Sequence, residues 1–413
     1  MHKRAFWVGL LLICQIVFLS AWWTPSAWAF TEEQKLFSQA WRIVSQAYID
    51  DTFNQQNWWL VRENALRKGL ENRQATYAAI QSMLESLDDP FTRLLKPDQY
   101  RSLKVNTSGE LSGVGLQIAL DAESGKLEVV APIVGSPAEQ AGIQPRDRIL
   151  EIDGTLTSQL TLDEAAALMR GPVGTKVTLK IQDRNGEFKS IELVRDRIAL
   201  NPVYALLDQQ PNGASVGYIR LTQFSANAPS EVAHALTKLE QEGADAYVLD
   251  LRNNPGGLLQ AGIEIARLWL DKGTIVYTVN RQGMLGSFEA DGVALTKDPL
   301  VVLVNQGTAS ASEILAGALQ DNGRAQLVGE KTFGKGLIQS LFDLPDGAGL
   351  AVTVAKYETP KHRDIHKLGI TPDLEVALDA ILASDRVGTM SDSQYQAALQ
   401  MLSGTPVLAA GTA

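Results

Sequence analysis

Cysteine is almost absent from this 413-residue chain, whose only one is Cys14. Histidine is scarce as well, with four residues, and acidic residues outnumber basic ones, which gives a formal net charge of −10 at pH 7. Because Cys14 lies in an N-terminal apolar segment, removal of that segment would leave no thiol, disulfide or cysteine-ligated metal site. The acidic balance, without a basic run, argues against a nucleic-acid-binding protein.

The N-terminus has the pattern of an export signal. A basic start at residues 2–4 precedes an apolar run at residues 5–23, and Ala27-Trp28-Ala29 fits the A-x-A cleavage pattern. We therefore expect cleavage after Ala29, a mature chain that begins at Phe30, and an exported protein. The alternative is that the apolar run, which is long enough to span a bilayer, remains as an anchor.

Periodicity divides the rest of the chain into four regions. Apolar residues at helical spacing predict a helical domain over residues 30–104. Short apolar stretches between turn residues predict a compact β-rich module of PDZ size over residues 105–196. Alternation of strands and helices predicts an α/β core over residues 197–376, followed by a helical tail over residues 377–413. The predicted fold class is thus a multidomain protein of mixed α+β and α/β type.

Two residues of the α/β region have the chemistry of a hydrolase. Ser310 follows a very apolar run, residues 299–305, that breaks at small residues and then turns helical, and Lys335 lies between Gly334 and Gly336. A lysine amine can remove the proton of a serine hydroxyl, so no histidine is needed. A lysine works as a base near neutrality only if burial lowers its pKa by about three units. Taken alone, each residue is also compatible with an ordinary turn.

Two strand-to-helix turns supply candidate oxyanion donors. If Gly256 or Gly257 faces Ser310, its N–H and that of Ala311 would hold the oxyanion that forms when the hydroxyl attacks a carbonyl. The alternative is that this glycine pair, which follows Pro255, makes only a sharp turn.

Three further polar residues are candidates for supporting roles. Gln339 lies four residues after Lys335, on the same face if the strand is extended, and would orient the neutral amine. Asp321 closes the helix after Ser310, and Glu313 lies in the first turn of that helix, where the helix dipole alone favours a carboxylate.

Other motifs in the chain do not support a competing chemistry. Residues 213–217 fit G-x-S-x-G, but a strand is expected after the serine instead of a helix. Residues 329–335 fit most of a phosphate-binding loop, but Gly336 replaces the magnesium-binding Ser or Thr, so we expect no nucleotide. His362 and His366 lack the glutamate of a zinc-binding helix, so metal binding is the minor alternative and we expect no cofactor.

The β-rich module offers a site for a peptide terminus. Its first loop runs into a strand, and its N–H groups could hold a C-terminal carboxylate while the peptide adds alongside as a further strand. The alternative is a glycine turn at the start of a strand. The candidate residues are Gly113, Val114, Gly115 and Leu116.

Three stretches together resemble the carboxyl-terminal processing proteases, or tail-specific proteases. They are residues 250–257, 307–313 and 334–339, in the order found in that family. The resemblance implies a serine endopeptidase with a PDZ domain that recognises the substrate's free C-terminal tail, and a protease core of the ClpP/crotonase-like type. The alternative is a PDZ-bearing scaffold protein whose protease-like domain is inactive.

The resemblance also implies a role for each site residue. Ser310 would be the nucleophile and Lys335 the general base, with Gln339 orienting the lysine. The amides of Gly256 and Ala311 would form the oxyanion hole. An aspartate of the family's relay falls on Asp321.

The helical region is most similar to that of the photosynthetic members of the family, through Trp41, Tyr48, Asp50, Trp58 and Trp59. Those members remove a C-terminal extension from the precursor of a photosystem II reaction-centre protein, which lets the manganese cluster assemble. The resemblance therefore implies a location in a thylakoid lumen or periplasm. It also implies association with the lumenal side of the membrane through the substrate, without a span of the protein's own.

Overall fold

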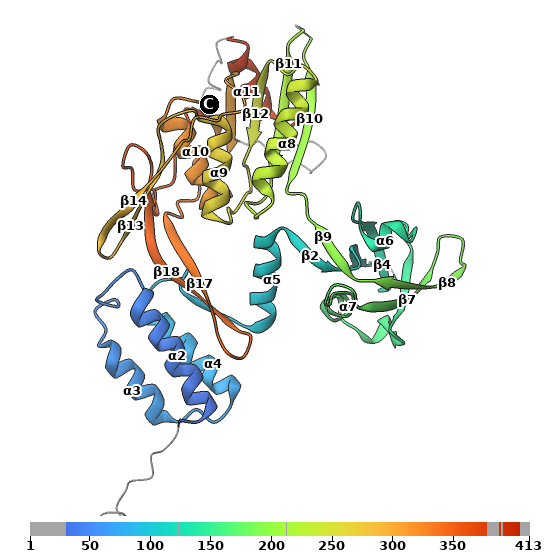
Figure 1. Cartoon of the computed structure of the whole chain (residues 1–413), viewed down its shortest axis with the longest axis vertical. Coiled ribbons are helices and arrows are strands. Elements are labelled where there is room, and N and C mark those ends of the chain that lie inside the picture. Colours follow the sequence, from blue (N-terminus) through green and yellow to red (C-terminus); the bar gives the residue numbers. More distant parts are fainter. Residues whose placement is uncertain (1–29, 122–123, 212, 378–387, 390, 405–413) are drawn as a thin grey trace, which may run out of the picture. The chain divides into compact units, whose positions relative to one another are not determined.

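The computed structural model describes residues 30–413 except 122–123, 212, 378–387, 390 and 405–413 (Figure 1). The chain divides into two compact units, residues 1–94 with 341–352, and residues 95–340 with 353–413. The predicted leader, residues 1–29, lies outside the described residues, as does much of the predicted tail. Within the described ranges, no helix has the length and apolarity needed to cross a bilayer.

The first unit is built on three helices whose N-termini are capped by polar side chains. The side chains of Thr31, Asn57 and Asn72 each accept a hydrogen bond from a first-turn N–H, which satisfies a donor that the helix itself cannot. The helices are α2 (Glu32–Ala47), α3 (Trp58–Lys68) and α4 (Arg73–Glu85). Leu36 and Ala40, two of the residues at helical spacing, are buried as expected.

A segment distant in sequence, residues 341–352, completes this unit. Asp346 in that segment forms an ion pair with Arg73 and accepts a hydrogen bond of 2.7 Å from the Tyr77 hydroxyl. Burial alone would raise the pKa of Asp346, but the hydrogen bonds from Tyr77 and Arg73 lower it overall. The helical domain therefore depends on a segment from the C-terminal half of the chain.

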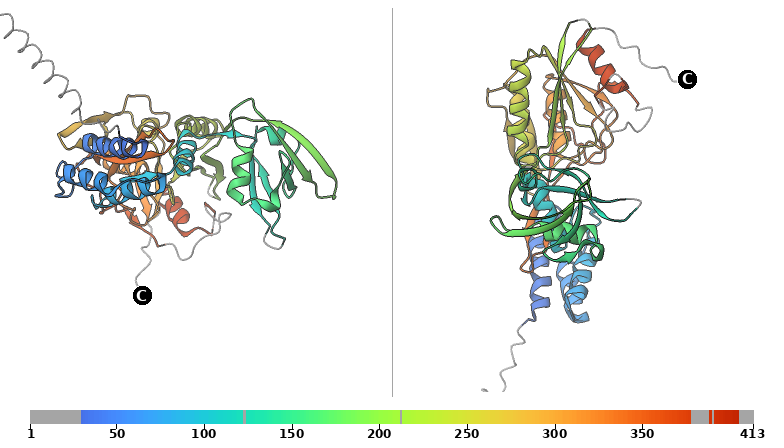
Figure 2. Two further views of the ribbon diagram at one scale, coloured as in Figure 1. Left: turned by 90° about the horizontal axis from the view of Figure 1, so that it is seen from below. Right: turned by 90° about the vertical axis from the view of Figure 1, so that its right-hand side faces the viewer.

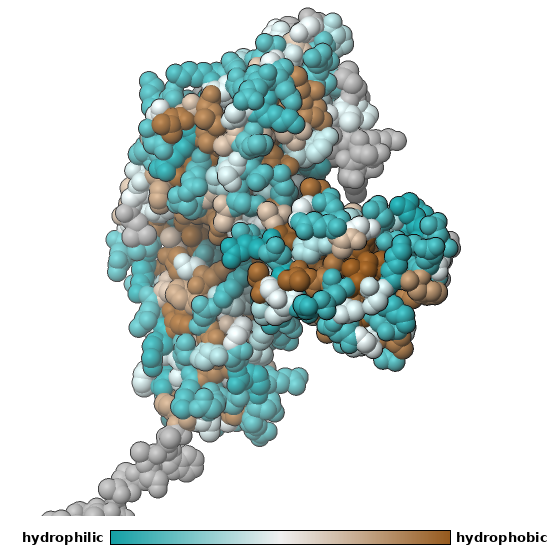
Figure 3. All heavy atoms as spheres, turned by 45° about the vertical axis from the view of Figure 1, so that its right-hand side comes forward, coloured by the Kyte–Doolittle hydropathy of each residue, from teal (hydrophilic) through white to brown (hydrophobic). Residues whose placement is uncertain are grey.

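The PDZ-sized module contains a six-stranded antiparallel sheet, in which five strands follow the order β3-β4-β5-β7-β8 and β6 pairs with β5. Its elements are β3 (Leu116–Leu120), β4 (Leu127–Pro132), α6 (Pro137–Gln140), β5 (Arg148–Ile152), β6 (Thr155–Leu156), η1 (Thr157–Gln159), α7 (Leu162–Met169), β7 (Lys176–Gln182) and β8 (Phe188–Val194). The helix α7 begins where local sequence favours it, because the side chain of its N-cap, Thr161, accepts the Glu164 N–H. Hydrophobic residues gather on the face of this module that Figure 3 shows.

Chain segments on either side of this module pair with each other. The strands β2 (Glu110–Gly113) and β9 (Asp196–Ala199) form an antiparallel ladder, and α5 (Pro97–Ser108) precedes β2. Both connections between the module and the rest of the chain therefore run side by side.

The α/β region contains a six-stranded sheet in the order β10-β11-β12-β15-β16-β19. All its neighbouring strands are parallel except β10 and β11. The strands are β10 (Val203–Gln209), β11 (Ser215–Leu221), β12 (Ala246–Asp250), β15 (Leu300–Val304), β16 (Gln326–Gly329) and β19 (Leu374–Glu375). The helices are α8 (Ala228–Gln241), α9 (Leu259–Trp269), α10 (Ala311–Asp321) and α11 (Ser393–Leu402).

Both faces of this sheet are covered. Since side chains alternate along a strand, Leu249 and Val302 pack in the cluster with α8, α9 and α10, whereas Val248 and Leu303 pack in the cluster with α11. Figure 2 shows α8 and α11 on opposite sides of the strands. The near-continuous apolar run at residues 299–305 is explained by this burial on both faces.

A second sheet, in which β13 pairs antiparallel with both β14 and β18, was not predicted as a unit. Its order is β1-β18-β13-β14, with β17 also paired to β18. The strands are β1 (Arg93–Leu95), β13 (Thr274–Asn280), β14 (Gly283–Glu289), β17 (Leu337–Asp343) and β18 (Gly349–Glu358). The expectation that a strand follows Lys335 is confirmed by β17.

The C-terminal helix is tied to the end of β12 by a buried ion cluster. Arg252 donates to Asp250 at 2.6 Å and to Asp392 at 2.7 Å, and it also donates to Gln394 at 2.9 Å. Both carboxylates are fully buried. Burial alone would raise the pKa of Asp392, but its hydrogen bonds from Arg252 lower it overall.

Removal of this arginine should strongly destabilise the fold. We expect Arg252→Met to lower the free energy of unfolding by about 3–5 kcal/mol, because two buried carboxylates lose their cation. Urea unfolding at pH 7 measures the loss.

The pH dependence of the unfolding free energy tests whether the unpaired carboxylates cause this loss. A carboxylate with a lowered pKa stabilises the fold above its unfolded pKa of about 3.9, and this contribution is lost as the pH falls through the folded value. The unpaired carboxylates of the variant should instead take up protons readily. The difference in unfolding free energy should therefore shrink between pH 7 and pH 4, and a constant difference would contradict this account.

Candidate active site

The candidate catalytic turns meet at one edge of the parallel sheet. Because β12 and β15 are neighbours, the turns that follow their carboxyl ends lie side by side. The Asn253 N–H donates to Asn305 Oδ1 at 2.9 Å, and the Ala309 N–H donates to the Asn254 carbonyl at 3.0 Å. The two strand-to-helix turns identified in the sequence are therefore bonded to each other.

Ser310 lies at the sharpest point of the second turn. It is the N-cap of α10, with φ 58° and ψ −119°, a conformation that non-glycine residues rarely adopt. Such backbone strain costs roughly 1–3 kcal/mol and is common at active sites. The side chain is half-buried at the positive end of the α10 dipole. A negative charge that develops beside Ser310 would be stabilised there.

Gly256 lies directly against Ser310. Its φ is +93°, and a Cβ at this position would lie 2.8 Å from Ser310 Cβ and 2.6 Å from the Ala309 carbonyl oxygen. The sequence left open whether this glycine faced the serine, and the structure places it there. Only glycine fits this approach.

The amides around Ser310 differ in their present partners. The Gly256 N–H donates to Asn254 Oδ1 at 2.9 Å, so this amide would have to exchange its partner to hold an oxyanion. Ala311 is the first residue of α10, where a helix has no acceptor for the N–H. The Gly257 N–H, the other glycine amide considered from the sequence, has no hydrogen bond within the described part of the chain.

The close approach of Gly256 can be tested with a matched pair of substitutions. Gly256→Ala should lower kcat by about 100-fold or more, because the added methyl displaces Ser310 and the turn. Gly243→Ala is the control, since Gly243 also has positive φ, +87°, but an added Cβ would meet nothing within 4 Å. Steady-state peptidase assays on both variants measure the effect, and equal activities would contradict it.

Glu313 connects the segments that carry Ser310 and Lys335. Its Oε2 accepts hydrogen bonds from the Ser310 N–H at 2.9 Å and from the Lys335 N–H at 2.8 Å. Its Oε1 accepts hydrogen bonds from Thr332 Oγ1 at 2.5 Å and from the Gly334 N–H at 2.7 Å. The side chain is fully buried, and burial raises the pKa of Glu313, while these hydrogen bonds act in the opposite direction.

Glu313 should therefore be needed for activity without touching substrate. We expect Glu313→Gln to lower kcat by about 100-fold, because an amide cannot accept four hydrogen bonds in this arrangement and the two segments would separate.

Glu164→Gln is the matched control for this substitution. Glu164 also accepts the N–H of its helix N-cap, from Thr161 at 2.8 Å, but it lies exposed on α7. The difference in kcat between the two variants measures the effect of losing a buried carboxylate instead of an exposed one. Full activity of Glu313→Gln would refute this role.

Lys335 is half-buried in a loop that other backbone segments closely surround. A Cβ at Gly336 would lie 2.7 Å from the His366 N, and one at Gly334 would lie 2.9 Å from the Gly369 N. The two flanking glycines therefore allow the backbone at His366 and Gly369 to approach the lysine loop closely. A turn on the surface would not need such contacts. Gln339 follows in β17, where its Nε2 donates to Thr353 Oγ1 at 3.4 Å.

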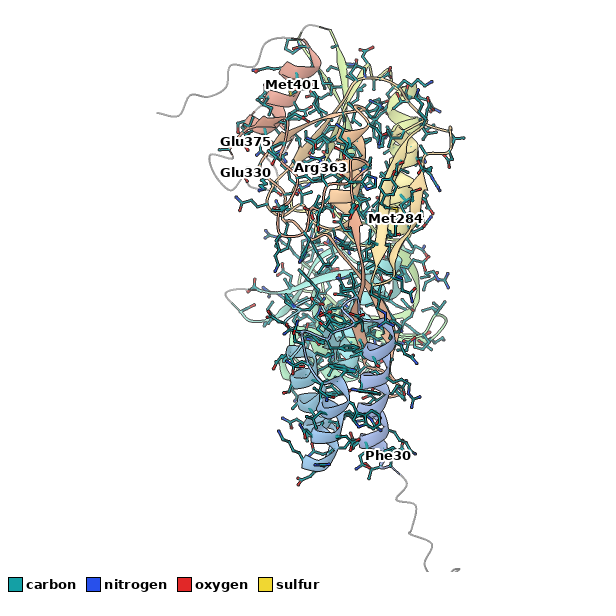
Figure 4. All side chains as sticks on the ribbon, turned by 90° about the vertical axis from the view of Figure 1, so that its left-hand side faces the viewer. Phe30, Met284, Glu330, Arg363, Glu375 and Met401 are labelled. Atoms are coloured by element: carbon teal, nitrogen blue, oxygen red, sulfur yellow. The ribbon has the colours of Figure 1, made fainter. Side chains whose placement is uncertain are left out.

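Asp321 does not join the other candidates. It lies at the opposite end of α10 from Ser310, about 16 Å away along the helix axis. Its carboxylate forms an ion pair with Arg363, labelled in Figure 4, and accepts the Lys361 N–H at 3.0 Å. A carboxylate at this distance cannot exchange a proton with the serine. We therefore replace the predicted relay role by a structural one, which anchors the loop that carries Arg363.

The predicted carboxylate loop joins β2 to β3. The Val114 carbonyl accepts the Ala138 N–H at 2.9 Å, and the Gly115 carbonyl accepts the Ile133 N–H at 2.9 Å. These bonds fix the carbonyls of the loop, which spans Gly113, Val114, Gly115 and Leu116. The same residues lead into β3, the edge strand of the module's sheet.

Sequence reasoning missed several residues of the site. Asn254 is fully buried and accepts the Gly256 N–H, and Thr332 donates to Glu313. The Tyr357 hydroxyl lies 3.0 Å from the Ser310 carbonyl oxygen. Thr332 lies inside the phosphate-loop-like stretch, and the spacing of Ser310 and Glu313 is that of a helix-capping pair, which is a usable signal.

The site combines a strained serine with a facing glycine turn, at the carboxyl edge of a parallel sheet. The Glu313 carboxylate bonds both the serine and the lysine loop, and the chain also carries a PDZ-like module. These features define a serine peptidase that recognises peptide ends. A family model described as peptidase family S41 matches residues 215–376, and a PDZ domain model matches residues 128–183. A carboxyl-terminal-processing protease of Synechocystis sp. is 63% identical over 99% of this chain and 96% of that protein. The chain belongs to peptidase family S41, among the carboxyl-terminal-processing proteases.

Other relatives agree with this assignment. The chloroplastic carboxyl-terminal-processing peptidase 2 of Arabidopsis thaliana is 49% identical over 89% of this chain and 73% of that protein. Among solved structures, a photosystem II D1 C-terminal processing protease aligns with a TM-score of 0.55 and 42% identity, over 84% of this chain and 94% of that chain. The predicted family, the multidomain fold class and the assignment as a peptidase are confirmed.

Proposed function

We propose that this protein removes a C-terminal extension from the precursor of a photosystem II reaction-centre protein, in a thylakoid lumen or periplasm, and so permits assembly of the manganese cluster. The similarity to a photosystem II D1 C-terminal processing protease, at 42% identity, supports this substrate. The N-terminal sequence pattern supports export, with cleavage after Ala29. The protein would reach the membrane through its substrate.

Ser310 and Lys335 would carry the reaction. Ser310 Oγ attacks the scissile carbonyl carbon while Lys335 Nζ takes the hydroxyl proton, and the carbonyl oxygen becomes an oxyanion held by the amides of Ala311 and Gly256. The C–N bond then breaks, the departing amine takes the proton from Nζ, and the tail leaves. Lys335 Nζ then takes a proton from water, the hydroxide attacks the acyl carbon, the ester bond to Ser310 breaks, and the proton returns from Nζ to Ser310 Oγ. Gln339 would orient the lysine.

The observation that carries this mechanism is the shared carboxylate oxygen of Glu313. It holds the main-chain N–H groups of Ser310 and Lys335 at 2.9 and 2.8 Å, so the two residues are fixed with respect to each other. An inactive scaffold protein would not need this arrangement. The alternative of a non-catalytic PDZ protein is therefore disfavoured.

The chain from Phe30 should release the tail of a synthetic precursor with an apolar C-terminal extension. Ser310→Ala and Lys335→Arg should each reduce release by about three orders of magnitude or more, because arginine keeps the charge but does not deprotonate. Mass spectrometry of the products gives the rate and the cleavage site.

A precursor with an amidated C-terminus is the matched control substrate. It lacks the carboxylate that the loop from Gly113 to Leu116 would bind, so KM should rise while the cleavage site stays the same. Equal cleavage by wild type and Ser310→Ala would contradict the mechanism, and unchanged KM for the amide would contradict tail recognition.

A further inference from the structure

Tyr357 on β18 contacts the main chains of both proposed catalytic residues. Its hydroxyl lies 2.6 Å from the Lys335 carbonyl oxygen and 3.0 Å from the Ser310 carbonyl oxygen. Its own N–H donates to the Gly336 carbonyl at 3.0 Å. The side chain is 1% exposed, so water does not compete for these bonds. Ser310 and Lys335 are 25 positions apart in sequence, and one tyrosine bridges them.

The hydroxyl complements the carboxylate of Glu313. Glu313 Oε2 accepts the N–H groups of Ser310 and Lys335, and the Tyr357 hydroxyl faces the carbonyl groups of the same two residues. Glu313 thus holds the N–H groups of Ser310 and Lys335, and Tyr357 holds their carbonyl groups. A hydroxyl has one proton, so it donates mainly to the nearer Lys335 carbonyl and partly to that of Ser310, as a three-centre bond.

The two carbonyl groups do not depend equally on Tyr357. The Ser310 carbonyl also accepts the N–H groups of Glu313 at 2.8 Å and Ile314 at 3.0 Å, as the first acceptor of α10. The helix therefore holds Ser310 even without the tyrosine. The lysine loop lies outside any helix or strand, so its position depends on bonds such as this one.

We infer that Tyr357 is a positioning residue for the reaction, whose hydroxyl acts together with the Glu313 carboxylate to set the distance between the Ser310 nucleophile and the Lys335 base. This inference rests on the proposed roles of those two residues. Displacement of a reacting group by about 1 Å can cost about 100-fold in rate. A tyrosine that only filled the core would need its ring and not its hydroxyl.

Tyr357→Phe removes the hydroxyl and keeps the ring. We expect kcat to fall by about 10- to 100-fold with KM changed less than about twofold, because substrate contacts are untouched while the base moves. The acid limb of the kcat profile, which reports deprotonation of the base, should move to higher pH as the loosened loop admits water.

Tyr395→Phe is the matched control. Tyr395 is also fully buried, and its hydroxyl donates to Asp208 Oδ2 at 2.7 Å, on the opposite side of the parallel sheet from α10. This variant should lose similar stability in urea unfolding and keep the wild-type kcat and pH profile. If Tyr357→Phe unfolds too readily at the assay temperature, both variants are assayed at a lower temperature at which urea curves show them folded.

Hydrolysis of p-nitrophenyl acetate separates this inference from the proposed function. Hydrolysis of this ester needs attack by Ser310 but no recognition of a tail. The rate with Ser310→Ala therefore gives the background hydrolysis that does not depend on Ser310. If wild type hydrolyses the ester but releases no tail, the processing function fails and the ester rates still decide the role of Tyr357. The inference is overturned if Tyr357→Phe and Tyr395→Phe have the same kcat, or if Ser310→Ala hydrolyses the ester as fast as wild type.

Discussion

One buried carboxylate, that of Glu313, fixes the two residues that we propose as nucleophile and base. It brings together a helix N-terminus and a loop, which are separated along the chain by the length of α10 and by β16, by accepting the N–H groups of Ser310 and Lys335 on one oxygen. Burial of a charge in this way is unfavourable unless hydrogen bonds compensate for lost hydration. Four donors surround Glu313, so the hydrogen bonds that hold Ser310 and Lys335 offset part of the cost of burial.

The fold provides the rigid surroundings that this carboxylate needs. Parallel strands β12 and β15 bring two turns to the same edge of the sheet, and the turns bond to each other through Asn253 and Asn254. Behind them, the Arg252 cluster ties the end of β12 to α11 with fully buried charges. The strained conformation of Ser310 is sustained because its neighbours on both sides are fixed in this way.

Much of this architecture follows from patterns visible in the sequence. The alternation of strand and helix, the Thr161 cap of α7 and the strand after Lys335 all come from local periodicity and capping chemistry, which act over a few residues. The antiparallel strands β13 and β14 were not predicted. They pair with each other, but their place in the sheet is set by the pairing of β13 with β18, which joins residues about 80 positions apart. The partner of the Gly256 N–H and the bridge made by Tyr357 depend on side-chain conformation in the folded core, on which local patterns carry no information. The family resemblance assigned catalytic roles to both Asp321 and Ser310. In the folded chain the two residues lie at opposite ends of α10, which the resemblance alone did not reveal.

Amide hydrogen exchange at Ser310 and Lys335, followed by NMR, tests the central claim most directly. If one carboxylate oxygen of Glu313 accepts both N–H groups, both amides should exchange slowly and with the same opening free energy, since the same event exposes them. Exchange of the Lys335 amide at the rate of an exposed loop, while the Ser310 amide stays protected, would show that the two residues are not held by a common acceptor and would contradict the account.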